Sequence, residues 1–285
     1  MLTSLDHVLF AVRDLDAATA AYTRLLGREP SWRGSHPSQG SANTLFRLER
    51  SYLELIAPAG DGPTGDMLRE RLDAQGEGLW GLAFGTDDAD ACAKTLRERG
   101  LPASDPVPGE GRDERSGALR EWRNVYLPPA ATRGVVVFAI EHRSPADALP
   151  VAEPTGGRGI VQAIDHVVIR SGDPEATIAL YGQGLGLRLA LDRTFEKRGV
   201  RLLFFRVGGV TVEVAAQAGA EPVDRPDEPW GVAWQVDDAA AARTRLTEAG
   251  FDVTETRSGN KPGTRVCTVK DGTCGVPTLM IGPEA

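Results

Sequence analysis

Hydrophobic and polar residues alternate in short runs along the whole chain, a period that is typical of half-buried β-strands. Four longer segments instead place apolar residues at helical spacing, and each runs from an aspartate suited to a helix N-cap to a glycine suited to a left-handed C-terminal position. The strand-like runs are 5–12, 44–48, 51–57, 80–86, 134–141, 164–171, 201–207, 210–216, 230–236 and 275–281, and the helical segments are 14–27, 87–100, 173–186 and 237–250. The pattern predicts four copies of one unit, consisting of a strand, a helix and about three further strands.

The four predicted units form a duplicated pair. A shift of 159 positions superimposes His7 on His166 and Glu54 on Glu213, and a shift of 150 positions superimposes Trp80 on Trp230. Units one and three are therefore sisters, as are units two and four. Because the segment between the halves is rich in Pro, Gly and Ala and lacks periodicity, we expect it to be a linker. The predicted boundaries are a first domain at 1–143, a linker at 144–159 and a second domain at 160–285.

Several motifs of this repeat resemble those of a known superfamily. A DH dipeptide opens the first strand of units one and three, their helices end in LLG or GLG, and their last strands carry a carboxylate in YLELIA and TVEVAA. These features resemble the vicinal oxygen chelate superfamily, which includes glyoxalase I, bleomycin-resistance proteins and extradiol dioxygenases. The segment 34–48 followed by SYLELIAP is similar in particular to its glyoxalase-like domains. The resemblance implies an α+β fold of four βαβββ units in two domains, whose curved, mainly antiparallel sheets form cups with a divalent metal on the concave floor.

Two histidine and glutamate pairs are the strongest candidates for chemistry. His7 and Glu54 have the same separation as His166 and Glu213, and both glutamates have apolar neighbours within a strand. Because burying an ionised carboxylate alone is costly, each needs a partner. Imidazole with carboxylate suits Zn, Ni, Fe(II) or Mn, so we predict these four residues as metal ligands and Glu54 and Glu213 also as catalytic proton carriers. The simpler alternative is a histidine hydrogen-bonded to a glutamate, without a metal.

The resemblance also implies ligands from the second unit of each pair, and these are missing. Their places hold Gly81 and Phe138 in unit two, and Gly231 and Leu279 in unit four. Each cup would then offer two ligands, fewer than a catalytic metal usually has. Because type I extradiol dioxygenases need a histidine where Gly231 stands, that activity is not expected.

Three alternatives follow from the missing ligands. His36 or Asn43 could complete the first site. Unit one could instead pair with unit three, which would bring all four predicted ligands together. Alternatively, the cups could be metal-free binding pockets.

A few other polar residues are candidates for binding or for the surface. Arg47 and Arg206 occupy equivalent places in units one and three, where each could meet an anionic substrate or pair with a surface acid. With His36 and Asn43 they form the predicted substrate-binding set. His142, at the start of the linker, is expected to be solvated.

Composition and charge narrow the class of protein. The net charge of −8 and a pI near 5.2 disfavour nucleic acid and anionic membranes as partners and favour a small-molecule ligand. The three cysteines lack CxxC spacing, so no disulfide framework is expected. The first residues show no basic, apolar leader, which predicts a cytoplasmic protein. The excess of arginine over lysine suggests a bacterial, high-GC genome, and we expect a monomer or homodimer.

Two functions compete at this point. The first is a divalent-metal-dependent enzyme of lyase, isomerase or dioxygenase type, acting on a small oxygenated substrate through a metal-stabilised oxyanion. The second is a non-catalytic protein that sequesters a small molecule or antibiotic, as bleomycin-resistance proteins do.

Overall fold

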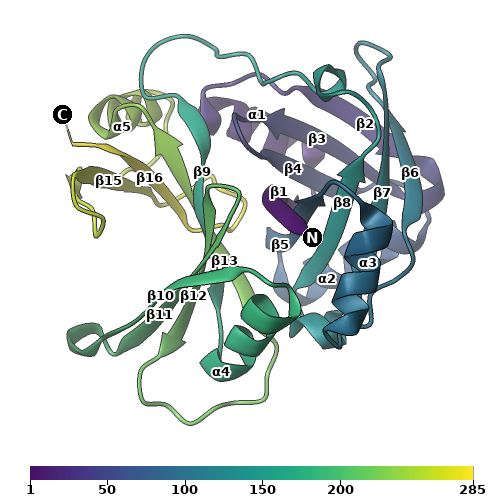
Figure 1. The fold of residues 1–285 in the computed structure, drawn as a ribbon. Helices are drawn as coiled ribbons and strands as arrows, with labels where there is room; N and C mark the ends of the chain where they lie inside the picture. Colours follow the sequence, from purple (N-terminus) through teal and green to yellow (C-terminus); the bar gives the residue numbers. More distant parts are fainter. Residues whose placement is uncertain (285) are drawn as a thin grey trace.

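The protein consists of two eight-stranded sheets with the same strand order, as seen in a computed structural model that describes residues 1–284 (Figure 1). The first sheet has the order β2-β3-β4-β1-β5-β8-β7-β6 and the second the order β10-β11-β12-β9-β13-β16-β15-β14. The first sheet comprises β1 (Leu2–Ala11), β2 (Trp32–His36), β3 (Ser41–Arg47), β4 (Tyr52–Pro58), β5 (Gly78–Thr86), β6 (Val107–Arg112), β7 (Leu119–Leu127) and β8 (Val136–His142). The second comprises β9 (Val161–Arg170), β10 (Arg188–Phe195), β11 (Val200–Val207), β12 (Val210–Gln217), β13 (Glu228–Val236), β14 (Arg257–Ser258), β15 (Thr264–Val269) and β16 (Thr278–Pro283).

Consecutive units pair within each sheet. Strands β1 and β5, the first strands of units one and two, run antiparallel at the centre of the first sheet, and β9 and β13 do the same in the second. Parallel pairings join β1 to β4, β5 to β8, β9 to β12 and β13 to β16, while the remaining pairings are antiparallel. The predicted α+β architecture of two cup-shaped domains is confirmed. The alternative in which unit one pairs with unit three is wrong, because those units lie in different sheets.

Aspartates cap the helices as predicted, but in two helices the capping residue lies one position later than predicted. The helices are α1 (Leu15–Leu26), α2 (Pro63–Gln75), α3 (Ala89–Glu98), α4 (Pro174–Thr177) and α5 (Ala239–Glu248). Asp14 caps α1 by accepting from the Ala17 amide at 2.9 Å, and Gly27 ends it at a φ of 68°. For α3 and α5 the capping residue is the second aspartate of each DD pair, Asp88 and Asp238, because that side chain reaches the first free amides.

The helix of unit three is not a regular α-helix. After α4, residues Ile178–Gly184 form a wider π-type turn, in which the Leu185 amide donates to the Leu180 carbonyl at 2.8 Å. Gly184 lies within this segment, where an added Cβ would stand 3.1 Å from Leu101 of the first domain. The irregular turn therefore coincides with close packing between the domains.

One hydrophobic core joins the two domains. It contains Leu5, Phe10 and Tyr22 from the first domain together with Ile164 and Trp234 from the second, all almost completely buried. The Tyr22 hydroxyl crosses the interface to donate to the Thr273 carbonyl at 3.0 Å. Because helices α1, α3, α4 and α5 contact the core-facing side of the strands, the opposite, concave sides are left for other contacts.

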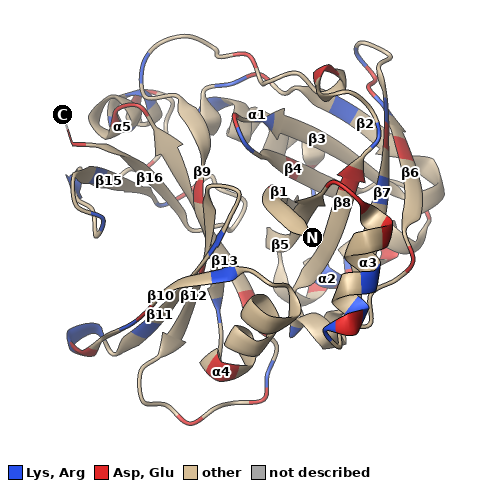
Figure 2. Cartoon of the chain, viewed as in Figure 1, with Lys and Arg blue, Asp and Glu red and all other residues tan. Residues whose placement is uncertain are grey.

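The surface carries both signs of charge. Helix α3, for example, presents acidic and basic residues side by side (Figure 2). Among the described residues, no helix is both long and apolar enough to cross a membrane.

Candidate functional site

The strand register brings each predicted histidine and glutamate to the same concave face. Strand β1 pairs with β4 so that His7 lies opposite Tyr52 and Leu9 opposite Glu54. Because residues two apart on a strand share a face, His7 and Glu54 project together. Strands β9 and β12 repeat this register for His166 and Glu213. Each sheet thus holds one pair, and the four residues do not form one site.

A β-bulge adds an aspartate to each pair. The register of β1 against β5 slips between Leu5 and His7, and that of β9 against β13 slips between Ile164 and His166. The bulged residues, Asp6 and Asp165, accept hydrogen bonds from Nδ1 of the adjacent histidines at 2.7 and 2.8 Å. The DH dipeptide thereby fixes each ring and directs Nε2 toward the glutamate.

In the first domain the Asp6–His7–Glu54 triad is more covered, although the Asp6 and Glu54 side chains are still 14% and 12% exposed. His7 Nε2 lies 3.3 Å from Glu54 Oε2 but has no hydrogen-bond partner among the described residues, and only 2% of the side chain is exposed. Tyr52 stacks on the imidazole with ring centres 4.3 Å apart, and Phe138 meets its edge. This site is therefore a buried polar centre within an aromatic cup.

The electrostatics of this triad favour a cation between His7 and Glu54. Burial alone would raise the pKa of Asp6 and of Glu54, but hydrogen bonds and charge from the neighbouring histidines outweigh it and lower both pKa values. Burial alone would lower the pKa of His7, but Asp6 and Glu54 raise it. Because Asp6 is an ionised acceptor, Nδ1 must carry a hydrogen, and a neutral His7 would aim its Nε2 lone pair at a carboxylate. A proton or a metal ion between Nε2 and Oε2 removes that repulsion.

Two structural elements close the first cup. Leu68 and Leu72 of α2, a helix absent from the predicted unit, pack against Ala11 and Ile56 on the concave side. At the mouth, Leu149 from the segment between the domains is 2% exposed and packs with Trp32 and Tyr52. The segment is fixed there, since the Ala152 amide donates to the Arg47 carbonyl at 2.8 Å.

In the second domain the same triad lies in an open face. His166 and Glu213 are 19% and 17% exposed, and their Nε2 and Oε2 atoms are 3.8 Å apart. Strand β10 is solvent-exposed along most of its length. Burial raises the pKa of Glu213, and the charge of His166 offsets this only in part. The carboxylate that is accessible to a substrate is thus also the one with the raised pKa.

The structure brings Asn43 to the first triad and keeps His36 at its margin. Asn43 Nδ2 donates to Glu54 Oε1 at 2.8 Å, while its own Oδ1 is buried without a partner. His36 meets Trp122 at 6.3 Å between ring centres and lies close enough to help lower the pKa of Glu54.

The two equivalent arginines have different surroundings. Arg47 lines a pocket beside Asp6 and Tyr52. Arg206 donates to the Thr211 hydroxyl at 2.7 Å, on the strand pair that carries Glu213.

His142 is 36% exposed, in line with the expectation that it is solvated, but it also has a protein contact. Its Nε2 lies 2.9 Å from Asp6 Oδ2. Each carboxylate oxygen of Asp6 therefore contacts a histidine.

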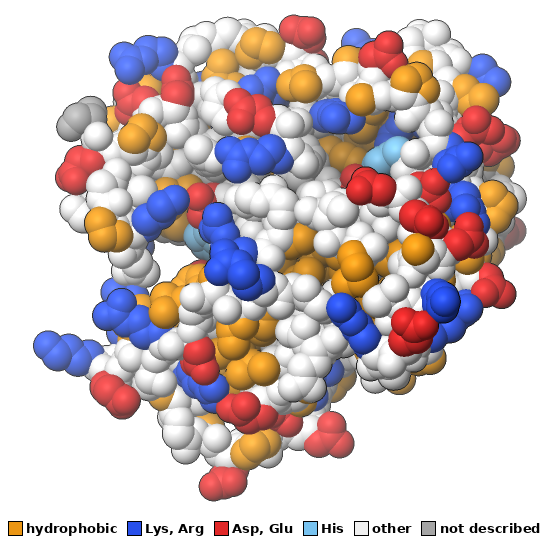
Figure 3. Space-filling view, viewed as in Figure 1, with side chains coloured by type: hydrophobic (Ala, Val, Ile, Leu, Met, Phe, Trp, Pro, Cys, Tyr) orange, Lys and Arg blue, Asp and Glu red, His pale blue; other side chains and the backbone are white. Residues whose placement is uncertain are grey.

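The surface also shows histidines in recessed places. Two hollows on the face drawn in Figure 3 each contain a histidine beside basic side chains.

The triads fit part of the requirements of a metal site. Two donor atoms on one Zn-sized ion lie about 3.4 Å apart at a near-tetrahedral angle, close to the His7–Glu54 separation. Each imidazole is oriented by an aspartate, as is usual for a metal-binding histidine. His7 Nε2 and Asn43 Oδ1 are also buried without a hydrogen-bond partner among the described residues, so both are free to bind an ion. Within residues 1–284, however, no three His, Cys, Asp or Glu side chains are grouped to hold an ion. An ion would have His and Glu from one domain, with Asn43 available only in the first.

Unit two provides no further ligand of these types. In unit one, His7 pairs with Tyr52, and Glu54 lies two residues after Tyr52. In unit two, Gly81 pairs with Val136, and Phe138 lies two residues after Val136. Gly81 and Phe138 therefore occupy the positions of His7 and Glu54. The same relation holds in unit four for Gly231 and Leu279, since Val232 pairs with Thr278. An added Cβ at Gly81 would lie 2.7 Å from the Val136 carbonyl, so a side chain here requires the strands to move.

Sequence reasoning missed Asp6 and Asp165 as site residues, and also Arg120, which lines the same pocket as Arg47 with its guanidinium 5.6 Å from the Tyr52 ring centre. The repeated DH dipeptide was a usable signal for the aspartates, because a metal-type histidine usually has a carboxylate partner. Arg120 has no counterpart in the repeat, so no sequence signal pointed to it.

Comparisons with known proteins agree with this architecture. The Glyoxalase-like domain family matches residues 5–163, and the Glyoxalase/Bleomycin resistance protein/Dioxygenase superfamily matches residues 165–268. The chain belongs to the glyoxalase-like family. Its two glyoxalase-like domains therefore account for nearly the whole length.

Individual relatives of this glyoxalase-like protein include enzymes. An ethylmalonyl-CoA/methylmalonyl-CoA epimerase of Cereibacter sphaeroides is 31% identical over 100 residues, which cover 35% of this chain and 73% of the epimerase. A mutant of 4-hydroxymandelate synthase from Streptomyces coelicolor has a TM-score of 0.72 and 16% identity, covering 100% of this chain and 94% of that one. A hypothetical protein from Staphylococcus aureus has a TM-score of 0.66 and 12% identity, with 96% and 97% covered. These two structures share the fold of the whole chain.

Proposed function

We propose that the protein is a divalent-metal-dependent enzyme that transfers a proton on a small oxygenated substrate, with the open concave face of the second domain as its reaction site. The observation that carries the proposal is the partly exposed Asp165–His166–Glu213 triad, in which the imidazole is 19% exposed, whereas the imidazole of the first-domain triad is 2% exposed. The name of the epimerase relative also supports proton-transfer chemistry.

The side chains of the second triad have distinct roles in this proposal. Asp165 holds the ring of His166 through Nδ1, and His166 Nε2 with Glu213 Oε2 would bind the ion. When bound, the ion would act as a Lewis acid that stabilises negative charge developing on a substrate oxygen. His7 and Glu54 would hold a second ion in the closed first domain, with Asn43 beside them.

Glu213 is the proposed proton carrier. Glu213 is partly exposed beside His166, where it can reach a substrate proton, and burial raises the pKa of its carboxyl in the absence of an ion. Glu54 is held by His7 and Asn43, which lower its pKa against the effect of burial, so we assign it to ion binding. Arg206, which lies on the strand next to that of Glu213, is the proposed contact for an anionic group of the substrate.

Solvent deuterium exchange tests this function. The metal-loaded protein is incubated in D2O with methylmalonyl-CoA, ethylmalonyl-CoA and a panel of small carbonyl acids, and deuterium uptake is followed by mass spectrometry. We expect catalysed uptake on at least one compound, and Glu213→Gln should slow it by about 100-fold or more because the proton carrier is lost. Glu248→Gln, which removes an exposed carboxylate from α5, should match the wild type.

The rival function is sequestration, and the ligand-poor positions Gly81, Phe138, Gly231 and Leu279 favour it. Saturable binding of a compound without exchange or turnover, in protein that takes up no metal, would establish the rival. Uptake that is equally fast in Glu213→Gln would contradict the assigned role of this residue.

A further inference from the structure

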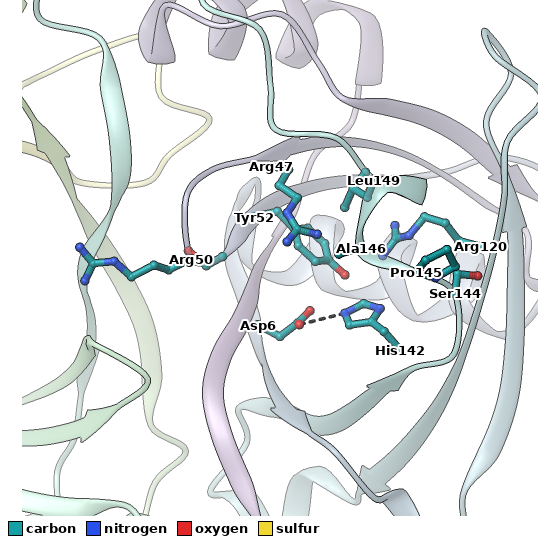
Figure 4. A pocket seen from close by; sticks show the side chains of 11 residues that line it. Asp6, Arg47, Arg50, Tyr52, Arg120, His142, Ser144, Pro145, Ala146 and Leu149 are labelled. Carbon is teal, nitrogen blue, oxygen red and sulfur yellow. Dashed lines mark hydrogen bonds and ion pairs between the residues drawn. The ribbon is translucent and has the colours of Figure 1, made fainter.

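A pocket of about 170 Å³ lies at the mouth of the first cup, away from the second-domain triad (Figure 4). One wall is formed by strand residues, including Asp6, Arg47 and Arg120, and the other by the start of the segment that joins the domains. Figure 4 shows Arg47, Arg120 and Tyr52 gathered around the Asp6–His142 pair.

Arg120 is a buried cation without an acidic partner. Only 6% of the residue is exposed, and its guanidinium lies 5.3 to 5.8 Å from the ring centres of Trp32, Tyr52 and Trp122. Among the ion pairs of residues 1–284, none involves Arg120 or Arg47. Aromatic faces compensate a desolvated guanidinium only partly, so a counter-ion at this position would be strongly stabilised.

The carboxylate in the pocket does not fill that role. Asp6 Oδ1 contacts His7 at 2.7 Å and Oδ2 contacts His142 at 2.9 Å, so both oxygens are already engaged by imidazoles. Ser51 also lines the pocket, and its hydroxyl has no hydrogen-bond partner among residues 1–284. Two guanidinium groups without an acidic partner in this part of the chain therefore line one small cavity together with a serine.

We propose that this pocket binds a small oxyanion, with a carboxylate or phosphate group held by Arg47 and Arg120 and hydrogen-bonded to Ser51. Guanidinium groups bind such planar or tetrahedral oxyanions through paired N–H donors. The site goes beyond the proposed proton-transfer function and does not depend on it, because no residue of the second domain lines the pocket.

Calorimetric titration of the full chain tests the proposal. Inorganic phosphate and malonate are titrated separately at constant ionic strength set with chloride, so that general screening is unchanged. We expect saturable binding of one anion per chain, and at least tenfold weaker binding for Arg47→Gln because a charged hydrogen-bond donor is lost.

Arg188→Gln is the matched control. It removes the same charge from an exposed position on β10 that does not line the pocket, while Figure 4 shows Arg47 and Arg120 at the pocket itself. Its affinity should stay within about twofold of the wild type. Arg120→Lys, checked for unchanged melting temperature, keeps the charge but loses the forked donors and should also weaken binding.

The pattern of binding decides the outcome. Binding of phosphate alone, malonate alone or both supports the site and identifies its head group. The proposal is overturned if neither anion binds saturably, or if Arg47→Gln and Arg188→Gln weaken binding equally, since the effect would then be one of net charge.

Discussion

The variant His166→Ala is expected to lose the metal of the second domain, with affinity weakened by more than about 100-fold. In this triad the imidazole Nε2 and the Glu213 carboxylate are the two donors, so removing one leaves a single protein ligand on a partly exposed face. Binding is measured by calorimetry and by metal mass spectrometry of protein purified without chelator or an affinity-tag nickel step. An ion at the proposed His7 and Glu54 site of the first domain should be retained.

Graded variants separate this effect from general damage. Asp165→Asn keeps the shape of the residue but weakens the orienting hydrogen bond to His166, and should cost about 10–100-fold in metal affinity. Asp252→Asn, which alters an exposed carboxylate paired with Lys270, should bind metal normally. Wild-type affinity in His166→Ala would rule out this residue as a ligand.

Substitution of Arg133 by methionine is expected to destabilise the whole molecule by about 3–5 kcal/mol. Arg133 Nε donates to Asp227 Oδ2 at 3.1 Å across the boundary between the domains, and the Asp227 side chain is 0% exposed. Removing the guanidinium leaves a buried carboxylate without its ion-pair partner, which is more costly than the pair itself is favourable. Chemical denaturation followed by circular dichroism measures the loss.

Two further variants check the cause. Arg143→Met removes an exposed guanidinium from Glu141, whose side chain is 9% exposed. Because Glu141 keeps Arg123 and the Ala89 amide as partners, a loss below about 1 kcal/mol is expected. The double variant Arg133→Met with Asp227→Asn should recover much of the stability, because no unpaired charge remains buried. A double variant as unstable as Arg133→Met alone would show that packing, not charge, sets the effect.

The two domains place one motif in two environments. In both, an aspartate in a β-bulge fixes a histidine that faces a glutamate. In the first domain aromatic rings and Leu149 cover the triad, and the pKa of Glu54 is lowered. In the second the triad is open and the pKa of Glu213 is raised. The same motif thus has a covered imidazole in the first domain and a more accessible one in the second.

Local chemistry explains what could be predicted from the sequence. Strand alternation, aspartate caps and terminal glycines act over a few residues, and they determined the four units and their order. The same alternation predicted that Glu54 shares a face with Tyr52 and Ile56. The register of β1 against β4 and of β9 against β12 then places each histidine on the same face as its glutamate. The repeat made both pairs visible, since each appears twice at the same spacing.

Only the tertiary structure decided which units share a sheet and which cup is open. The repeat is compatible with either pairing of units, and the choice depends on contacts between strands far apart in the chain. The closure by α2 and Leu149, the pairing of His142 with Asp6 and the unpaired charge of Arg120 occur in one domain only. None of these features has a counterpart in the repeat. Each depends on contacts between segments that are distant in the sequence, and the pattern of neighbouring residues carries no information about such contacts.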